Sequence, residues 1–283
     1  MRRDELLKKN PHVERLRLRK QKKIIRVTIF IFSVLAILFV GIGLLTRIPK
    51  FSIHTITIVG TRVIENKNIQ SIIEREISGN YLWPYAKKNI LIYPKERILK
   101  ILQNEFPRIE TITIEQVGVN DISIAITERM GVSLWCGVEY PEPSESPCYF
   151  VDEKGYVFAR APYFSGTVYF KWYGPTHDGG NIGSQLVVPN GFESMSRFVE
   201  RLRVFGLDPY IWVEKKGDMY SIFLNRPGGD GVNLLLSKRQ DLDDLLIMLA
   251  AGFDSEPLLS LIKNGLPGIS YIDARYEDRI YYK

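Results

Sequence analysis

The sequence predicts an α+β protein: a single N-terminal transmembrane helix, a compact strand-helix-helix-strand-strand module, and a mixed, mainly antiparallel β domain with helices. Three observations predict this: an uncharged apolar run near the N-terminus, two amphipathic helical patterns among short alternating strands, and a longer series of strand patterns after them. With 283 residues, 45% hydrophobic and 25% charged, the chain has the composition of a folded protein and the length for more than one domain. We place its parts at residues 1–24, 25–46, 51–128 and 129–283.

The positive charge of the chain is concentrated at its N-terminus. Residues 1–26 contain 11 Lys and Arg against three acidic residues, whereas the rest of the chain carries 27 basic and 29 acidic groups. A domain that binds nucleic acid would carry a basic stripe on its folded part, so we expect no nucleic-acid partner. Two cysteines and three histidines leave little material for a metal cluster, so we expect no metal site and no cofactor.

Residues 27–45 are 19 consecutive residues without a charge. At ~1.5 Å per helical residue they cover most of a ~30 Å hydrocarbon layer, and Arg26 and Arg47 flank them. A buried core helix rarely stays apolar all round for this length. A cleaved signal peptide has a shorter apolar region and a small-residue cleavage site, which the exit sequence TRIPKFS lacks. We therefore expect a retained membrane anchor.

The flanking charges set the orientation of this anchor. The basic side of a span stays in the cytoplasm, so we expect residues 1–24 there, as a tail without regular structure, and both folded domains outside. The basic segment at residues 13–26 either lies on anionic lipid or only sets the topology. Gly41 and Gly43 do not have GxxxG spacing, so nothing in the span supports self-association.

The module at residues 51–128 begins with the strand pattern FSIHTITIVG. Asn66 is a candidate N-cap for a first helix that Gly79 ends, and Pro94 opens a second helix that ends before Pro107. Two strands follow, joined by a turn at residues 119–121. The residues expected in the core are Ile69, Ile72, Ile73 and Ile77 in the first helix, Ile98, Ile101 and Leu102 in the second, and Ile112, Ile114, Ile122, Ile124 and Ile126 in the strands.

The domain at residues 129–283 alternates strands with two helices. The segment CYFVDEKGYVF is typical of a hairpin with its turn at residues 152–155. Gly206 ends an amphipathic helix, and Ser237–Gln240 is a candidate capping box that opens a later one containing Leu242, Leu245, Leu246 and Leu249. We expect the first of these helices at 192–205 and strands at 132–135, 149–151, 156–158, 211–214, 220–224 and 232–236.

Two segments carry a resemblance to a known family. The first is FPRIETITIEQ with the strand that ends in Thr127-Glu128-Arg129, and the second is the closing sequence ISYIDARYEDRIYYK. The first module resembles a POTRA domain, and nearly the whole chain resembles the FtsQ/DivIB bacterial cell-division proteins. The chain departs from that family at residues 138–148, which form a longer loop, and at 170–190.

The resemblance implies a function. It implies a single-pass scaffold of the bacterial divisome in the plasma membrane at the division septum, with FtsB/DivIC-like and FtsL-like partners. Such a protein helps regulate septal peptidoglycan synthesis through protein–protein contacts, and we expect neither an enzyme nor a small-molecule substrate. In this family the C-terminal strand region binds FtsB. The matching residues here are Tyr276 first, then Arg275, Asp278 and Tyr282.

The residues themselves support this C-terminal site. A chain-terminal strand is often a sheet edge, whose unpaired N–H and C=O groups can accept a strand from a partner. Tyrosine is a frequent interface residue because it buries a large ring while its hydroxyl still finds a partner. The alternative is that Tyr276 packs on its own sheet. If the site is an interface, Tyr276→Ala or loss of residues 280–283 weakens binding and leaves stability unchanged.

Cys136 and Cys148 flank the segment GVEYPEPSESP. If they pair, the disulfide closes this loop and contributes ~2.5–3 kcal/mol of stability. The alternative is two free thiols. An exported domain that holds both cysteines of the chain favours the disulfide.

Two other classes of function stay open. A membrane-anchored cell-wall enzyme or enzyme accessory would need a cleft with paired catalytic groups, but the chain has no GxSxG, HExxH or Walker motif. His54 is expected on a strand and His177 in a polar turn. A POTRA-bearing export component would normally accompany a membrane β-barrel, and no barrel-like series of strands follows.

Overall fold

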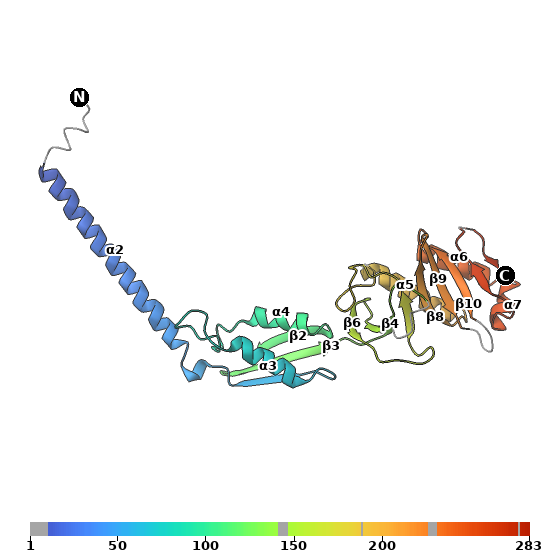
Figure 1. Cartoon of the computed structure of the whole chain (residues 1–283), viewed down its shortest axis with the longest axis horizontal. Helices are drawn as coiled ribbons and strands as arrows, with labels where there is room; N and C mark the ends of the chain where they lie inside the picture. Colours follow the sequence, from blue (N-terminus) through green and yellow to red (C-terminus); the bar gives the residue numbers. More distant parts are fainter. Residues whose placement is uncertain (1–10, 141–146, 188, 226–230, 277) are drawn as a thin grey trace, which may run out of the picture. The chain divides into compact units, whose positions relative to one another are not determined.

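The computed structural model describes residues 11–140, 147–187, 189–225, 231–276 and 278–283. It confirms the α+β class, with one apolar N-terminal helix and mixed sheets (Figure 1). The chain divides into two compact units: Met1–Asn104 with Thr111–Thr127, and Glu105–Glu110 with Glu128–Lys283. Residues 105–110 group with the second unit because the Arg129 N–H donates to Arg108 O at 2.8 Å and the Arg129 side chain donates to Pro107 O.

Helix α2 (Pro11–Leu45) is longer than the predicted span. Its segment Arg19–Leu45 has a mean hydropathy of 2.8 in its most apolar window, and is long and apolar enough to cross a membrane. The expectation of an irregular tail up to residue 24 is wrong from Pro11 onward, because the basic segment continues the helix. Leu, Arg, Lys and Gln are strong helix formers, and extending an existing helix avoids the cost of nucleation.

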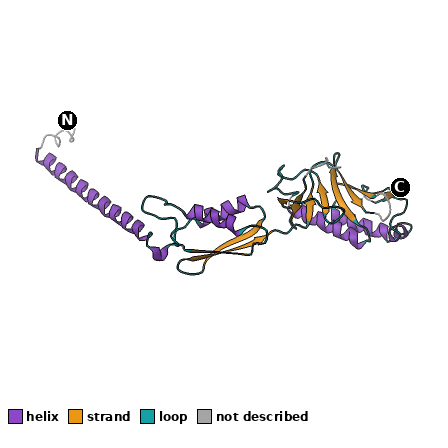
Figure 2. Ribbon diagram, turned by 60° about the horizontal axis from the view of Figure 1, so that its bottom comes forward, coloured by secondary structure: helices purple, strands orange, loops and turns teal. Residues whose placement is uncertain are grey.

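The first unit has the predicted strand-helix-helix-strand-strand order. Within the described residues its sheet has three strands, with β3 between β1 and β2, and β1 runs parallel to β3. Both helices lie on one face of this sheet (Figure 2), where they cover alternate residues of β2 and β3. The elements are η1 (Pro49–Phe51), β1 (Thr55–Val59), α3 (Asn66–Ile77), α4 (Lys95–Glu105), β2 (Ile109–Gln116) and β3 (Asp121–Glu128).

The predicted core of this unit is buried, with two local corrections. All the listed isoleucines and Leu102 are buried except Ile101, which is half-buried. Asn66 is not the N-cap of α3: Glu65 takes that position, and Asn66 Oδ1 instead accepts a hydrogen bond of 2.6 Å from Thr61 Oγ1. His54 lies one residue before β1, with its Nδ1 3.1 Å from Asn120 Nδ2.

The second unit is built on a single mixed sheet. The described residues form nine strands in the order β12-β11-β10-β9-β8-β7-β4-β5-β6. Neighbours pair in parallel at β10–β11, β7–β8 and β4–β7, and antiparallel elsewhere. The strands are β4 (Ser133–Trp135), β5 (Tyr149–Val151), β6 (Val157–Arg160), β7 (Phe170–Tyr173), β8 (Pro209–Lys215), β9 (Met219–Leu224), β10 (Val232–Ser237), β11 (Tyr271–Asp273) and β12 (Tyr281–Tyr282).

Helices α5 (Pro189–Val204), α6 (Leu242–Phe253) and α7 (Leu258–Lys263) lie along one face of this sheet (Figure 2). The main core fills the space between the helices and the sheet, and Phe198, Trp212 and Leu249 are almost fully buried in it. β7 falls in the 170–190 stretch, where no strand was expected. Its four residues join β4 to β8 through parallel pairing on both sides.

The capping-box prediction is wrong in position. Helix α6 begins at Leu242, and its N-cap is Asp241, whose side chain accepts hydrogen bonds from the N–H groups of Asp243 and Asp244. Ser237 and Gln240 do share a bond, from Ser237 N–H to Gln240 Oε1 at 3.2 Å. This bond closes a turn at the end of β10, and the Asp241 side chain caps the helix that follows.

Candidate protein interface at the C-terminal sheet edge

Strand β12 forms one edge of the nine-stranded sheet that the described residues make. It pairs antiparallel with β11, with Tyr282 opposite Ile272 and Tyr281 opposite Asp273. The pairing continues into Lys283, which exchanges N–H···O bonds of 3.2 Å with Tyr271. Among the strands that the structure describes, β12 pairs with β11 alone, so its other side can accept an added strand.

The predicted strand over Arg275 and Tyr276 is wrong. β11 ends at Asp273, and both residues lie in the connection to β12. The Ala274 N–H still donates to Leu235 O at 2.9 Å, and Gln240 Nε2 donates to Ala274 O. These bonds hold the start of the connection against β10 and the turn that follows it.

Arg275 is held in place by Asp273, two residues earlier. Arg275 Nε donates to Asp273 Oδ1 at 2.8 Å and its terminal nitrogen to Oδ2 at 2.6 Å, a two-pronged ion pair. The Asp273 side chain is buried, and its hydrogen bonds with the guanidinium lower its pKa below the ordinary value. The pair fixes the direction in which the chain leaves β11.

Tyrosine rings cover the exposed side of this connection. Tyr276 is 51% exposed, and its ring meets the Tyr281 ring edge-on with centroids 5.2 Å apart. Tyr281 and Tyr282 are also exposed, on opposite faces of β12 as alternating strand residues. The ring contact of Tyr276 is therefore with the edge strand β12 of its own sheet, while about half of its side chain stays exposed. Asp278 is exposed in the same connection.

Ile280 anchors the last residues of the chain. Its side chain packs against the main core and approaches α6 so closely that a Cβ added at Gly252 would lie 2.4 Å from Ile280 Cδ1. Loss of residues 280–283 would therefore remove core packing and the pairing of β12. It would lower stability, contrary to the expectation from sequence.

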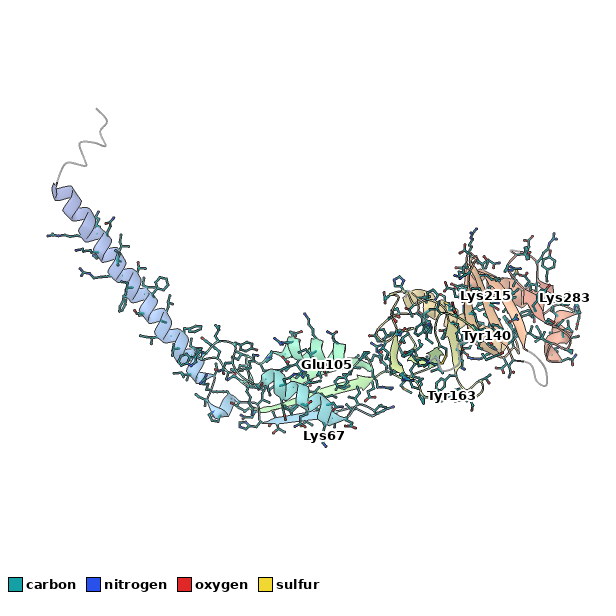
Figure 3. The ribbon with its side chains drawn as sticks, in the orientation of Figure 1. Lys67, Glu105, Tyr140, Tyr163, Lys215 and Lys283 are labelled. Atoms are coloured by element: carbon teal, nitrogen blue, oxygen red, sulfur yellow. A yellow bond between two sulfur atoms is a disulfide. The ribbon has the colours of Figure 1, made fainter. Side chains whose placement is uncertain are left out.

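A hollow of about 290 Å³ lies beside Arg275 and Tyr276. Its far wall includes Arg239, which donates to Asp218 Oδ2 at 2.9 Å. The start of β9 and the end of β10 also border the hollow, through Met219 and Ser237. We call Arg275, Tyr276, Asp278 and β12 the C-terminal edge (Figure 3 labels Lys283 at its end).

The structure places the four predicted residues in the last strand and the connection before it, but the described ring contact of Tyr276 is with Tyr281 and not with Tyr282. Arg275 and Tyr276 lie at the connection, Tyr282 lies on β12, and Asp278 is on the surface without a described contact to them. Sequence reasoning missed Asp273 and Arg239, and it included Ile280 and Tyr281 only within the segment 280–283. The Asp-x-Arg spacing was a usable signal for the ion pair, since both residues belong to the closing motif, but Arg239 comes from a distant turn.

Cys136 and Cys148 are joined by a disulfide. They directly follow β4 and precede β5, which pair antiparallel through Trp135 and Tyr149. The bridge extends that pairing by one position and closes the loop between the strands. It belongs to a smaller core cluster on the sheet face opposite the helices, with Leu134, Tyr173 and Val213.

His177 lies in a turn, as expected from the sequence. Its backbone N–H donates to Gln185 O, and the carboxylate of the neighbouring Asp178 accepts a hydrogen bond from the Gln185 N–H. No group of three or more His, Cys, Asp or Glu side chains suited to a metal ion occurs in the part of the chain that the structure describes.

The chain was also compared with known proteins. No protein-family model matches it, and no curated protein is significantly similar to it.

Proposed function

We propose that this protein is a single-pass membrane scaffold of the bacterial divisome, of the FtsQ/DivIB type. Its N-terminus lies in the cytoplasm, its folded units lie outside the plasma membrane, and it collects at the division septum. It helps regulate septal peptidoglycan synthesis by binding other division proteins. The arguments are the closing motif, the strand-helix-helix-strand-strand module after an apolar helix, and above all the C-terminal edge.

The observation that carries the proposal is the exposed strand β12 with Tyr276 beside it. A partner segment adds as a strand to the open side of β12, and backbone hydrogen bonds supply affinity. The tyrosine rings and the hollow at Arg275 supply selectivity. The partner on this edge is an FtsB/DivIC-like protein, and an FtsL-like protein joins the same assembly.

Tyr276→Ala tests the edge most directly. In the full chain, with the extracytoplasmic segment of the FtsB-like partner, the variant loses ~2 kcal/mol or more of binding free energy, about 30-fold in Kd. Its denaturation midpoint stays close to that of the unchanged protein, because the side chain is 51% exposed and its ring contact is with the exposed Tyr281. Tyr163→Ala is the matched control, since Tyr163 is 90% exposed (labelled in Figure 3) and lies far along the chain from β12. Undiminished binding by Tyr276→Ala contradicts the edge.

Localisation tests the divisome itself. A fluorescent protein fused to the N-terminus gathers at midcell in dividing cells if the proposal is right, and a uniform membrane signal contradicts it. A reporter that works only outside the cytoplasm is active after Lys283 and silent before Arg26, because the basic flank of α2 stays inside. The reverse result contradicts both the membrane anchor and the placement of the folded units outside the cytoplasm.

A further inference from the structure

The loop that joins α3 to α4 lies against the end of the apolar helix (Figure 1). We call residues 80–91 the Trp83 loop. The Tyr85 hydroxyl donates to Phe39 O at 3.1 Å, and the two rings lie 5.0 Å apart. Pro84 is buried against Gly43, where an added Cβ would lie 2.4 Å from Pro84 Cβ. Among residues 19–45 of α2, Gly43 is the buried one. The contact with Pro84 is therefore the point at which the Trp83 loop packs on the helix.

Hydrogen bonds secure the same contact just after the end of α2, at Thr46 and Arg47. Arg47 donates to Trp83 O at 2.6 Å and to Pro84 O at 3.3 Å. The Ala86 N–H donates to Thr46 Oγ1 at 3.1 Å. These bonds satisfy backbone groups of an irregular segment, which is the condition for such a segment to approach lipid.

Despite these contacts, the tip of the loop presents apolar side chains to its surroundings. Leu82 is 62% exposed and Trp83 is 69% exposed, and Tyr81 and Leu91 are exposed as well. Large apolar groups in one short loop are costly in water, at roughly 25 cal/mol for each Å² left exposed. Lys87 lies 5.9 Å from the Tyr81 ring centroid and Lys88 is exposed, so basic groups border the apolar tip.

The contacts with α2 fix the depth of the loop tip relative to the apolar run. Phe39 lies six residues before Leu45, the end of the apolar run, so Tyr85 meets the helix roughly 9 Å inside that end. Arg47 lies two residues beyond the run and bonds to Trp83 O. The loop therefore covers the depth from the outer hydrocarbon to the headgroups, where Trp and Tyr are enriched and lysine meets lipid phosphate.

We infer that the Trp83 loop inserts into the outer leaflet of the lipid bilayer beside α2, with Leu82 and Trp83 at the hydrocarbon boundary. The inference rests on the membrane anchor of the proposed function and not on the divisome. Its partner is a lipid surface because the loop is fixed to the helix that crosses that surface. The insertion gives the sheet and helices α3 and α4 of the first unit a second attachment to the membrane, besides their covalent connection to α2.

Trp83 itself is the reporter for the test. The other three tryptophans, Trp135, Trp172 and Trp212, are buried in the second unit, so the emission difference between the unchanged protein and Trp83→Phe isolates Trp83. The full chain is reconstituted in phosphatidylcholine and phosphatidylglycerol vesicles that carry bromine on the acyl chains, either near the headgroups or near the bilayer centre. Trp83 is expected to lose most of its emission to the shallow bromines and less to the deep ones.

A matched control moves the exposed tryptophan within the same unit. Val63 follows β1 in the chain, and its side chain is 65% exposed. The opposite end of β1 is the end that adjoins the turn in contact with η1, so Val63 lies at the end of β1 away from η1. Trp83→Phe combined with Val63→Trp is expected to show no quenching by either lipid.

Vesicle flotation separates the two ways of failing. Protein that does not float with the vesicles overturns the anchor and the insertion together. If the protein floats but Trp83 is not quenched, the insertion alone is overturned. The exposed apolar tip is then a surface for a protein partner and not for lipid.

Discussion

The Trp83 loop and the C-terminal edge both expose aromatic side chains, but their backbones differ. Carbonyls of the loop at Trp83 and Pro84 are occupied by Arg47, and its tip is apolar. At the C-terminal edge, β12 pairs with β11 alone among the described strands, and the tyrosines stand beside the Arg275–Asp273 ion pair. The hydrocarbon of a bilayer offers no hydrogen bonds, whereas a partner strand offers a whole ladder of them. The hydrogen-bonding state of the backbone thus distinguishes surfaces that composition alone would group together.

Removal of the disulfide has the largest expected effect and tests whether either surface depends on it. Cys136→Ser with Cys148→Ser should lower the free energy of unfolding by ~2.5–3 kcal/mol, because the open chain gains loop entropy. Denaturation of the full chain in detergent, followed by the fluorescence of the buried tryptophans, measures this loss. Partner binding and Trp83 quenching should not change. A change in either would mean that the surface is coupled to the bridged loop.

Arg275→Ala tests whether the ion pair at the C-terminal edge is structural. It leaves the buried Asp273 carboxylate without its two-pronged partner, so the free energy of unfolding should fall by roughly 2 kcal/mol. Arg279→Ala, at an exposed position in the same connection, is the control and should stay within about 0.5 kcal/mol. Equal stability of the two variants would show that the pair does not hold the edge.

Gly43→Leu tests how the Trp83 loop is held. The new side chain collides with Pro84, and the overpacking should destabilise the docked loop by about 1–2 kcal/mol. Gly41→Leu is the matched control, because a Cβ there meets nothing within 4 Å. Hydrogen exchange of the full chain in vesicles should speed up at residues 80–91 for Gly43→Leu alone. Unchanged exchange would mean that the loop does not depend on this contact.

Acid should weaken the C-terminal edge slightly and leave the Trp83 loop unaffected. Asp273 has a folded pKa below its ordinary value of 3.8, because Arg275 hydrogen-bonds the ionised form. Its contribution to stability is therefore present above pH 3.8 and is lost as the pH falls through the folded value. The free energy of unfolding of Asp273→Asn, measured against pH, should lack this part of the decline. Parallel curves for both proteins would contradict the assignment.

Local patterns in the sequence determined much of the fold. The apolar run predicted the long apolar helix, and the isoleucine spacings predicted the helices and the buried faces of β2 and β3, because period and burial are properties of neighbouring residues. The end of the chain indicated an edge strand, and β12 lies at the edge of the sheet. The same reasoning misplaced the start of α6, since two turn-forming segments follow each other there and only one caps the helix.

Only the tertiary structure decided what surrounds the two surfaces. Arg239 reaches the hollow at Tyr276 from a turn far back in the chain, and Ile280 fastens the last residues to α6. Pro84 and Gly43 are separated by 40 residues in the sequence, and their contact holds the Trp83 loop beside the apolar helix. Sequence periodicity reports which face of an element is buried, but not which distant element covers it. That choice depends on the packing of the whole chain.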